Sequence, residues 1–385
     1  MGRVAVVAAG HTPFGDHRRT AKSLFTEAFA QCLDSADKGL EPARVQEAWI
    51  GSLGFGGGQL GNLAALLTEH ARLPNIPARR VENACASSGF AFRDAYLAVR
   101  SGAVDVAVAG GVEVMNDLGP VRQRYWLGVS GDTEWERLAG LTFPGVYAMM
   151  AVRHMEEFGT TREQLAAVAV KNHRNGARNP NAQFRKEITI EDALRSPSVA
   201  YPFTLYDCCG TTDGATAVVL ASEATAREFT DTPVWVRGSG AATDHLALHD
   251  RATLTTLEAT RRAAADALRQ AEARVEDIDL MEVHDCFTIA EVLALEDLGL
   301  CPKGDGGRFT ASGATAIEGQ VAVNASGGLK AKGHPLGATG TGQVYELFHQ
   351  LRGTAEGRQR DGAEIGLAHN VGGSGATCAV HVLSR

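Results

Sequence analysis

The sequence predicts an α/β fold built from two similar halves. Short apolar strand-like runs alternate with longer amphipathic stretches along the 385 residues, which is the pattern of α/β proteins. Residues 25–54 contain a helix-like stretch, an acidic loop and a strand-like run, and a second copy of this arrangement spans residues 260–284. Because two such halves pack about a pseudo-twofold axis, we expect their equivalent loops to meet at one place.

The first element is an apolar run within residues 1–10, which we expect to be a strand. Arg3 is its only charged flank, and no span of eighteen apolar residues follows it. The seven cysteines form no CxxC pair, so neither a disulfide framework nor a zinc site is indicated, and the compartment is reducing. We therefore expect a cytoplasmic protein with no membrane span.

A cysteine in a turn of small residues is the next feature along the chain. Cys85 lies in the run Asn-Ala-Cys-Ala-Ser-Ser-Gly at 83–89, and the apolar positions of residues 90–100 have helical spacing. The free N–H groups at a helix N-terminus favour a thiolate over a thiol. Taken alone, Cys85 is either a presented nucleophile or a small buried residue, as most intracellular cysteines are.

The second half repeats this turn. Residues 323–328 read Val-Asn-Ala-Ser-Gly-Gly, so Ser326 falls where Cys85 falls in the first half. Each copy then continues through a helix into an apolar strand that ends in glycines, at 105–111 and at 364–373. The duplication is therefore expected to bring Cys85 close to the loops of the second half.

Between the halves, residues 116–200 change in composition. Trp126, Trp135 and several methionines stand among Arg- and Asn-rich helical stretches. The segment is too long, and in parts too apolar, for a flexible linker. Two interpretations stay open: a lid or substrate-binding subdomain, and a structural or subunit-contact excursion.

The charge balance limits the classes of partner. The formal net charge is −8, and the chain has no Lys/Arg run of the kind that binds a phosphate backbone. We therefore expect no binding of nucleic acid, and small molecules or proteins as partners.

Several motifs occur in one order along the chain. They are Asn-Ala-Cys-Ala-Ser-Ser-Gly at 83–89, Tyr-Pro-Phe-Thr-Leu-Tyr-Asp-Cys-Cys at 201–209 with Thr-Asp-Gly-Ala from 212, His-Asp-Cys-Phe at 284–287, Gly-Gly-Leu-Lys-Ala-Lys-Gly-His-Pro-Leu-Gly-Ala-Thr-Gly at 327–340, and Asn-Val-Gly-Gly at 370–373. With these motifs the sequence resembles the thiolases, in the branch that includes the sterol-carrier-protein-type and archaeal enzymes. The resemblance covers essentially the whole length.

This resemblance implies a five-layered αβαβα thiolase fold made of two duplicated halves with an inserted loop domain. The N-terminal half is expected at residues 1–117 and 201–240, the loop domain at 118–200, and the C-terminal half at 241–385. The resemblance also implies a homodimer or homotetramer, acyl-CoA substrates, and coenzyme A as the acyl carrier. It implies no metal and no permanently bound cofactor.

Thiolase chemistry gives a role to each candidate side chain. The reaction needs a nucleophile that holds the acyl group, a base that activates it, an acid/base near the substrate α-carbon, and donors for two oxyanions. Cys85 suits the first role, and His334, in a Gly-rich turn, suits the second because a neutral imidazole accepts a proton. By resemblance, His284 takes the position of an asparagine that helps form an oxyanion hole in most thiolases.

The sequence departs from the family in its last loop. Typical thiolases carry a second catalytic cysteine there, in a Cys-x-Gly loop, whereas this chain reads His-Asn-Val-Gly-Gly at 369–373. In the branch with a His-Asp-Cys-Phe loop, the cysteine of that loop is the expected second acid/base, which here is Cys286; the alternative is a small buried filler. His369, Asn370 and Gly372 are expected to line the substrate pocket, although His369 could instead cap a strand end.

The set Cys85, His284 and His334 also resembles the Cys-His-His triad of decarboxylating ketosynthases on the same fold. Those enzymes have no thiol like that of Cys286 and generally have Gly-His-Thr where this chain has Gly-His-Pro. Decarboxylation generates a carbanion without a base, whereas a thiolase must remove an α-proton. Cys286 therefore favours a thiolase.

We expect an acyl-CoA C-acyltransferase that uses a Cys85 acyl-enzyme for thiolytic cleavage of a 3-ketoacyl-CoA or for the reverse Claisen condensation. One alternative is a thiolase-like acyltransferase or carbon–carbon lyase in a complex with a small OB-fold or zinc-ribbon partner, in sterol side-chain or polyketide metabolism. Relatives that became aldolases tend to lose the nucleophilic cysteine, which this chain keeps. The other alternative, a non-catalytic lipid-binding protein, is disfavoured by the presence of all four candidate side chains.

Overall fold

The computed structural model describes residues 2–73 and 75–385, and its strands and helices alternate along the chain. The strands are β1 (Val4–His11), β2 (Glu47–Gly51), β3 (Ala78–Val81), β4 (Val106–Glu113), β5 (Ser198–Ala200), β6 (Phe203–Thr204), β7 (Gly214–Ser222), β8 (Val234–Thr243), β9 (Leu280–Glu282), β10 (Ala322–Val323), β11 (Ile365–Gly372) and β12 (Thr377–Ser384). The α-helices are α1 (Ala21–Asp34), α2 (Leu63–His70), α3 (Ser87–Ser101), α4 (Pro120–Gly128), α5 (Phe143–Phe158), α6 (Arg162–Ala177), α7 (Ile190–Arg195), α8 (Glu223–Phe229), α9 (Glu258–Ala271), α10 (Thr288–Asp297), α11 (Gly306–Ala311), α12 (Gly328–Ala331) and α13 (Thr339–Arg352).

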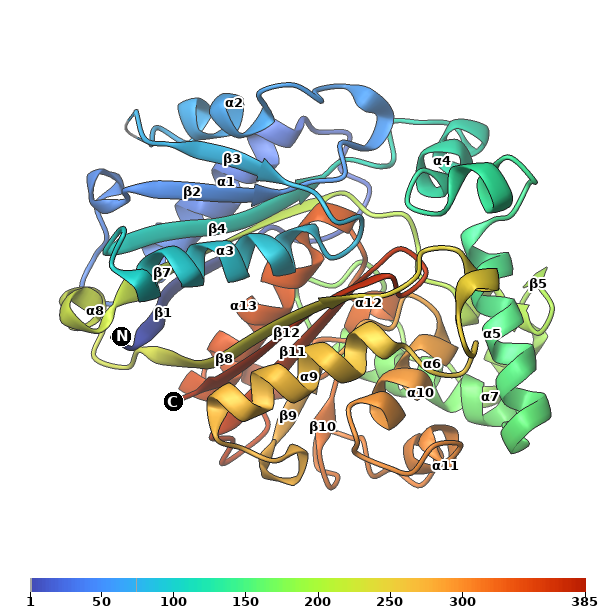
Figure 1. Cartoon of the computed structure of the whole chain (residues 1–385). Helices are drawn as coiled ribbons and strands as arrows, with labels where there is room; N and C mark the ends of the chain where they lie inside the picture. The colour runs from blue at the N-terminus through green and yellow to red at the C-terminus, as the bar shows by residue number, and fades with distance from the viewer. Residues whose placement is uncertain (1, 74) are drawn as a thin grey trace.

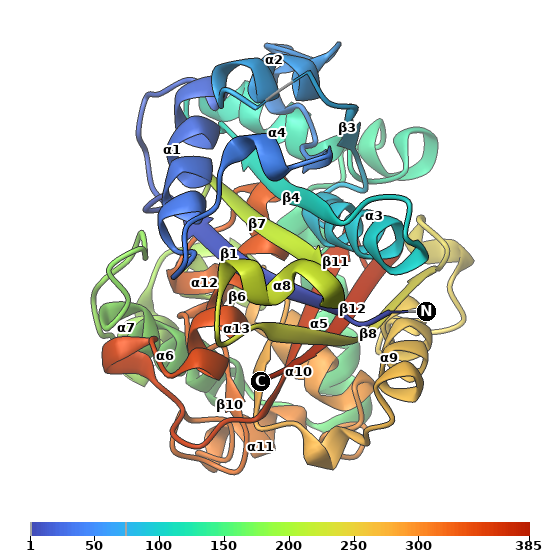
Figure 2. The same ribbon diagram turned by 90° about the vertical axis from the view of Figure 1, so that its left-hand side faces the viewer.

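The main sheet has ten strands in the order β10-β9-β11-β12-β8-β1-β7-β4-β2-β3. From the middle outward, both halves have the same pattern: two antiparallel pairings are followed by two parallel ones. The halves meet where residues 4–6 of β1 pair with 234–236 of β8 (Figure 2). The expected duplication is confirmed, since β3 occupies in the first half the edge position that β10 occupies in the second.

Helices lie on both sides of each half-sheet (Figure 1). The helices α1 and α2 pack on the outer face of the first half, and α9 and α10 pack on the outer face of the second. Between the halves lie α3 and α13, whose buried side chains, among them Phe92 and Phe348, pack with strands of both halves. The result is the expected five-layered αβαβα arrangement, in which the motif helices α3 and α13 are the shared middle layer.

The inserted segment carries α4 to α7 and lies at one end of the molecule (Figure 1). Its helices α5 and α6 pack against helices of the second half, whereas α4 packs against residues 55–57 of the first half. Tyr147 of α5 and Phe287, just before α10, belong to one buried apolar cluster. The predicted domain boundaries stay a prediction. The boundary at 240/241 falls inside β8, which pairs with β1 of the first half and along most of its length with β12 of the second.

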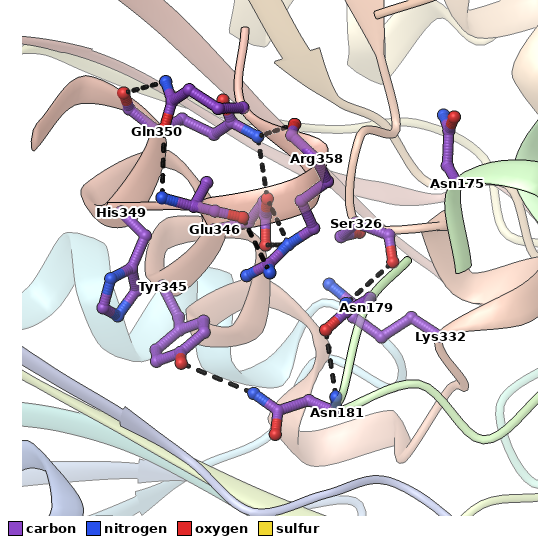
Figure 3. Close-up of polar contacts among 12 residues, drawn as sticks. Asn175, Asn179, Asn181, Ser326, Lys332, Tyr345, Glu346, His349, Gln350 and Arg358 are labelled. Carbon is purple, nitrogen blue, oxygen red and sulfur yellow. Dashed lines mark hydrogen bonds and ion pairs between the residues drawn. The ribbon is translucent and has the colours of Figure 1, made fainter. Parts of the chain in front are cut away.

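A polar network holds the inserted segment to the loop around Ser326 (Figure 3). The side-chain amide of Asn179 donates to the carbonyl of Ser326 at 2.8 Å, and that of Asn175 donates to the carbonyl of Asn324 at 3.0 Å. Figure 3 also shows the polar contacts of the neighbouring residues Tyr345, Glu346, Gln350 and Arg358. Because these hydrogen bonds are directed at the backbone, they fix the insertion to the second-half copy of the Cys85 loop.

Across residues 2–73 and 75–385, no helix combines the length and the apolar character needed to cross a bilayer.

Candidate active site

Cys85 lies in the tight turn between β3 and α3. The backbone turns at Ala84, whose φ is 51°, and the N–H of Ala86 donates to the carbonyl of Asn83 at 3.0 Å. Helix α3 then begins at Ser87, whose hydroxyl donates to the Ala84 carbonyl at 2.6 Å. The cysteine thus comes where the sequence placed it, just ahead of a helix, with its side chain turned to a cavity.

The protonation of Cys85 differs from the expectation for a helix N-terminus. Burial, and to a smaller extent the neighbouring Cys209 thiol, raise the pKa of the thiol to about 12. The backbone N–H groups of Gly373 and of Cys85 itself act on the sulfur in the opposite direction. Desolvation therefore outweighs the helix terminus, and the free site holds a thiol. The two N–H groups are positioned to receive a negative charge that forms beside the sulfur.

Three predicted catalytic residues converge. The Cys85 sulfur and one ring nitrogen each of His284 and His334 all lie within 4.8 Å of one another. The two imidazole rings are edge to face, with centroids 5.0 Å apart and an interplanar angle of 86°. His284 follows β9 and His334 lies between α12 and α13, so both belong to the second half, and the duplication brings them to the first-half cysteine.

The hydrogen bonds of His334 define which ring nitrogen is free. Its Nδ1 lies 2.7 Å from the hydroxyl of Thr339, and that hydroxyl donates its own proton to the carbonyl of Pro335 at 3.0 Å. The Nδ1 atom must therefore carry the ring proton, and Nε2 keeps a lone pair with no partner in the described residues. Burial lowers the pKa of His334 to about 3, so the ring is neutral at pH 7 and can accept the proton of a thiol.

His284 has the opposite tautomer. Asn370 accepts the N–H of Gly89 through Oδ1 at 3.2 Å, so its Nδ2 group is the donor, to the Cys85 carbonyl at 3.0 Å and to His284 Nδ1 at 3.3 Å. The proton of His284 is then on Nε2. Burial lowers the pKa of this histidine well below its ordinary value. The two imidazoles are therefore unlike: His334 offers an acceptor and His284 offers a donor.

Cys286 lines the same cavity as Cys85 and His334. Burial raises the pKa of its thiol well above the ordinary value, the thiols of Cys209 and Cys85 add to this, and the hydroxyl of Tyr147 lowers it. The cavity wall is otherwise mostly apolar, with side chains that include Met115, Leu127, Phe143, Phe287 and Leu336. A second thiol in an apolar space is suited to proton transfer at carbon.

The three residues predicted to line the substrate pocket do not line this cavity. His369 lies behind His284: its Nδ1 accepts the backbone N–H of His284 at 3.4 Å, and its Nε2 contacts the Thr260 hydroxyl at 2.9 Å. Gly372 packs against the Cys85 turn, where an added Cβ would meet the carbonyl of Asn83 at 2.3 Å. The reason is that β11 is an inner strand, whose side chains pack between layers. Gly373, just past its end, lines the cavity instead.

Sequence reasoning missed two buried residues that shape the site. The Tyr147 hydroxyl donates to the Gly373 carbonyl at 3.1 Å, and its ring stacks on Phe287 at 4.8 Å. The Glu113 carboxylate, at the end of β4, accepts the N–H groups of Phe55 and Gly337, each at 2.9 Å. A buried strand that ends in Glu is a signal that could have found Glu113, whereas nothing in the sequence around Tyr147 points to the cavity.

The Cys-His-His set is also a donor set that Zn²⁺ accepts, with one more position needed to complete a tetrahedron. The neutral thiol and the hydrogen-bonded Nδ1 atoms fit acid/base chemistry without an ion. That no metal is needed stays a prediction.

Comparison with known proteins gives the family. Residues 4–224 match the family model described as "Thiolase, N-terminal domain", and residues 240–385 match "Thiolase C-terminal domain-like". The chain is 48% identical over 387 residues to an acetyl-CoA acetyltransferase of Methanothermobacter thermautotrophicus, with 100% of both chains covered. It is 32% identical over 395 residues to human sterol carrier protein 2, covering 98% of this chain and 71% of that protein.

The fold also matches solved structures. The chain in "Ltp2-ChsH2(DUF35) aldolase" superposes with a TM-score of 0.86 at 24% identity, and the match covers 100% of this chain and 98% of that one. At this identity the likeness shows the fold alone.

Proposed function

We propose a reaction for this chain on one premise: the chain belongs to the thiolase family and is a thiolase-type acyltransferase. It transfers an acyl group from coenzyme A to Cys85, and then from Cys85 to the α-carbon of a second acyl-CoA, or it runs the same steps in reverse. The observation that carries the proposal is the convergence of the Cys85 sulfur with the nitrogens of His284 and His334 within 4.8 Å, beside Cys286.

In the first half-reaction, Nε2 of His334 takes the proton of the Cys85 thiol as the sulfur attacks the thioester carbonyl. The N–H groups of Cys85 and Gly373 stabilise the oxyanion of the tetrahedral intermediate. The departing coenzyme A thiolate takes the proton of Cys286. The products are acyl-Cys85, protonated His334 and a Cys286 thiolate, so every proton is accounted for.

In the second half-reaction, the Cys286 thiolate removes an α-proton from the second acyl-CoA. Its high pKa makes this thiolate a strong base. The enolate oxygen receives hydrogen bonds from Nε2 of His284 and from protonated His334. The enolate carbon attacks acyl-Cys85, the new carbon–carbon bond expels the Cys85 thiolate, and His334 returns the proton to it.

Intact-protein mass spectrometry with acetyl-CoA tests this assignment. We expect one acetyl group on the parent, mapped to the peptide that contains Cys85, and none on the Cys85→Ala variant. Cys209→Ala is the matched control, because Cys209 lines the same cavity but has no role in the proposal. An adduct that persists in Cys85→Ala and disappears in Cys209→Ala would contradict the proposal.

The separate role of Cys286 has its own test. Cys286→Ala should still be acylated at Cys85 but should fail to make or break the carbon–carbon bond. Exchange of the α-protons of acetyl-CoA with deuterium, followed by NMR, reports the step that Cys286 performs. A variant with unchanged exchange and unchanged turnover would assign the acid/base role to another group.

The name of the 48%-identical relative supports acetyl-CoA as one substrate. The resemblance to the thiolases supports a homodimer or homotetramer, and β3 is an edge strand of the main sheet with one side free to pair with a second copy. We propose the cytoplasm as the compartment. Size-exclusion chromatography with light scattering checks the oligomer, and a monomer would contradict it.

The second candidate is an enzyme that acts together with a small OB-fold partner. It is favoured by the solved structure with the TM-score of 0.86, whose printed title includes a DUF35 component. Co-purification of the tagged chain from its own cells decides between the two. A small protein retained in a fixed ratio, with acylation at Cys85 absent unless it is present, would favour the complex.

A further inference from the structure

A second cavity lies next to the catalytic one. Cys208, Cys209 and Gly210 line both cavities, so this short segment is the wall between them. The second cavity has a volume of about 460 Å³ and opens between the 183–188 loop of the insertion and the start of α12. No step proposed for the reaction uses it.

The cavity contains a buried lysine that forms no ion pair with the described residues. Only 3% of Lys330 is exposed, and within residues 2–73 and 75–385 its Nζ atom makes no hydrogen bond or ion pair. The Nζ atom lies over the rings of Phe184 and Tyr206, 5.8 Å from each centroid, and both rings line the cavity. Two aromatic faces stabilise an ammonium group only in part, and burial of an unpaired charge is costly.

The nearest carboxylates are already bound to other groups. Asp285 accepts the backbone N–H groups of Leu329 and Lys330 at 2.6 and 3.2 Å. Asp207 accepts the N–H of Thr204 at 2.8 Å and a threonine hydroxyl at the same distance through its other oxygen. Neither forms an ion pair with Lys330 in the described structure, so both carboxylates act on the ammonium group only from a distance.

The remaining lining residues add positive charge and no negative charge. Arg185 and Lys186 are exposed at the cavity, and none of its lining residues is Asp or Glu. His173 donates Nδ1–H to the Lys186 carbonyl at 3.0 Å, which leaves its buried Nε2 as an unpartnered acceptor. A ligand that suits this set has an anionic group for Lys330 and a flat or apolar body for the aromatic walls.

We propose that this cavity is a binding site for a small organic carboxylate, whose carboxylate group pairs with Nζ of Lys330 between Phe184 and Tyr206. Burial lowers the pKa of Lys330, and an anion beside it would favour the charged form. The site is separate from the catalytic cavity and differs from it in charge, because the catalytic wall is mostly apolar.

Isothermal titration of the full chain with benzoate and with its neutral isostere benzamide tests the proposal. We expect benzoate to bind at least about tenfold more tightly than benzamide, since only the anion pairs with the ammonium group. The ratio is measured on the unaltered protein and so does not depend on any variant folding. Equal affinity for the two compounds, or no binding of benzoate, would overturn the proposal.

Two variants locate the site. Lys330→Met keeps the length of the side chain and removes the charge, and benzoate should then bind at least about tenfold more weakly. Lys186→Met, at the exposed edge, is the matched control, with an expected change of less than about threefold. Benzoate affinity should be unchanged in Cys85→Ala and after acetylation of Cys85. An equal loss in both lysine variants, or competition with acetylation, would place the anion elsewhere.

The carboxylate that binds Lys330 can belong to a free acid or to the far end of an acyl group. A thioester with a terminal carboxylate and one without it distinguish the two sources. The second source rests on the proposed function, so it is tested by kcat/KM with succinyl-CoA and butyryl-CoA. A selective loss with succinyl-CoA in Lys330→Met would assign the site to the acyl group. No change with either thioester, together with lost benzoate binding, would assign it to a free acid. Failure of the acyltransferase reaction would leave the titration result standing.

Discussion

The two halves carry the same loop after equivalent strands at the opposite edges of the main sheet, and only one of the two loops presents a reactive group. Cys85 follows β3 and lines the catalytic cavity. Ser326 follows β10 and is fully buried: its hydroxyl donates to the carboxylate of Glu282 and accepts the N–H of Gly328 at 3.2 Å. One loop therefore keeps its side chain free for chemistry, and the other uses the equivalent side chain to hold the structure together.

The inserted segment explains the difference. It covers the second-half loop, where Asn179 binds the Ser326 carbonyl and the Cα of Gly176 would lie 2.6 Å from a Cβ added at Gly327. At the first-half loop it contributes only part of a cavity wall, through residues such as Phe143. The duplicated fold thus supplies two equivalent turns, and the insertion closes one of them and leaves the other open.

The largest effect is expected from exchanging the two side chains. Cys85→Ser should lower turnover at least about 10³-fold, because the hydroxyl is a weaker nucleophile at the same position. Ser326→Cys should gain no second acylation site, because that side chain has no access to a cavity. Turnover with acetyl-CoA and intact-mass spectrometry measure the two results. An acyl group on Cys at position 326 would show that the turn alone creates reactivity.

A smaller effect is expected at the residue that connects the two halves. Asn370 of β11 binds the Cys85 carbonyl and His284 Nδ1, so Asn370→Ala should leave His284 free to change tautomer and should lower kcat about 10²-fold. Asn370→Asp keeps the size but removes the donor, and should be similarly impaired. Steady-state kinetics gives the loss. Equal loss of acylation rate and of α-proton exchange would indicate general disruption, whereas we expect exchange to suffer more.

Much of this fold could be predicted from the sequence. The strands, the helices and the duplication follow from hydrophobic period and from recurring motifs, and these signals lie in short stretches of chain. The structure brings the motif residues Cys85, His284 and His334 together, with Cys286 in the same cavity, and their catalytic roles stay predictions. Their grouping required the two halves to meet, which the repeat itself predicts.

The features of the site that the sequence did not predict depend on contacts between distant segments. The position of His369 behind His284, and of Gly373 in place of Gly372 at the cavity, depends on which residue ends an inner strand. Tyr147 reaches Gly373 from 226 residues away in sequence, so no local pattern predicts it. The helix N-terminus suggested a thiolate at Cys85, and burial by groups from other segments reverses that direction.

Acid should lower the free energy of unfolding, because the second half contains buried neutral histidines. Burial lowers the pKa of His334, His369 and His381 to about 3, against about 6.5 in an unfolded chain. Below pH 6.5 the unfolded chain therefore binds protons that the folded chain does not, and stability falls as the pH drops towards 3. Urea unfolding across this range measures the fall. His381→Gln should make it shallower, by up to about 1.4 kcal/mol per pH unit; an unchanged slope would contradict the assignment.

The smallest effect on the chemistry is expected at Ser326, and it separates the two loops most clearly. Ser326→Ala removes the hydroxyl that donates to Glu282, a hydrogen bond to a buried carboxylate, and should cost about 1.5–3 kcal/mol of stability. Acylation of Cys85 should be unchanged within about twofold, because the Ser326 side chain does not reach the cavity. Urea unfolding and labelling by acetyl-CoA, measured on the same preparation, test both statements. A variant with normal stability and slowed acylation would mean that the second-half loop contributes to the chemistry. It would contradict the assignment of a purely structural role to Ser326.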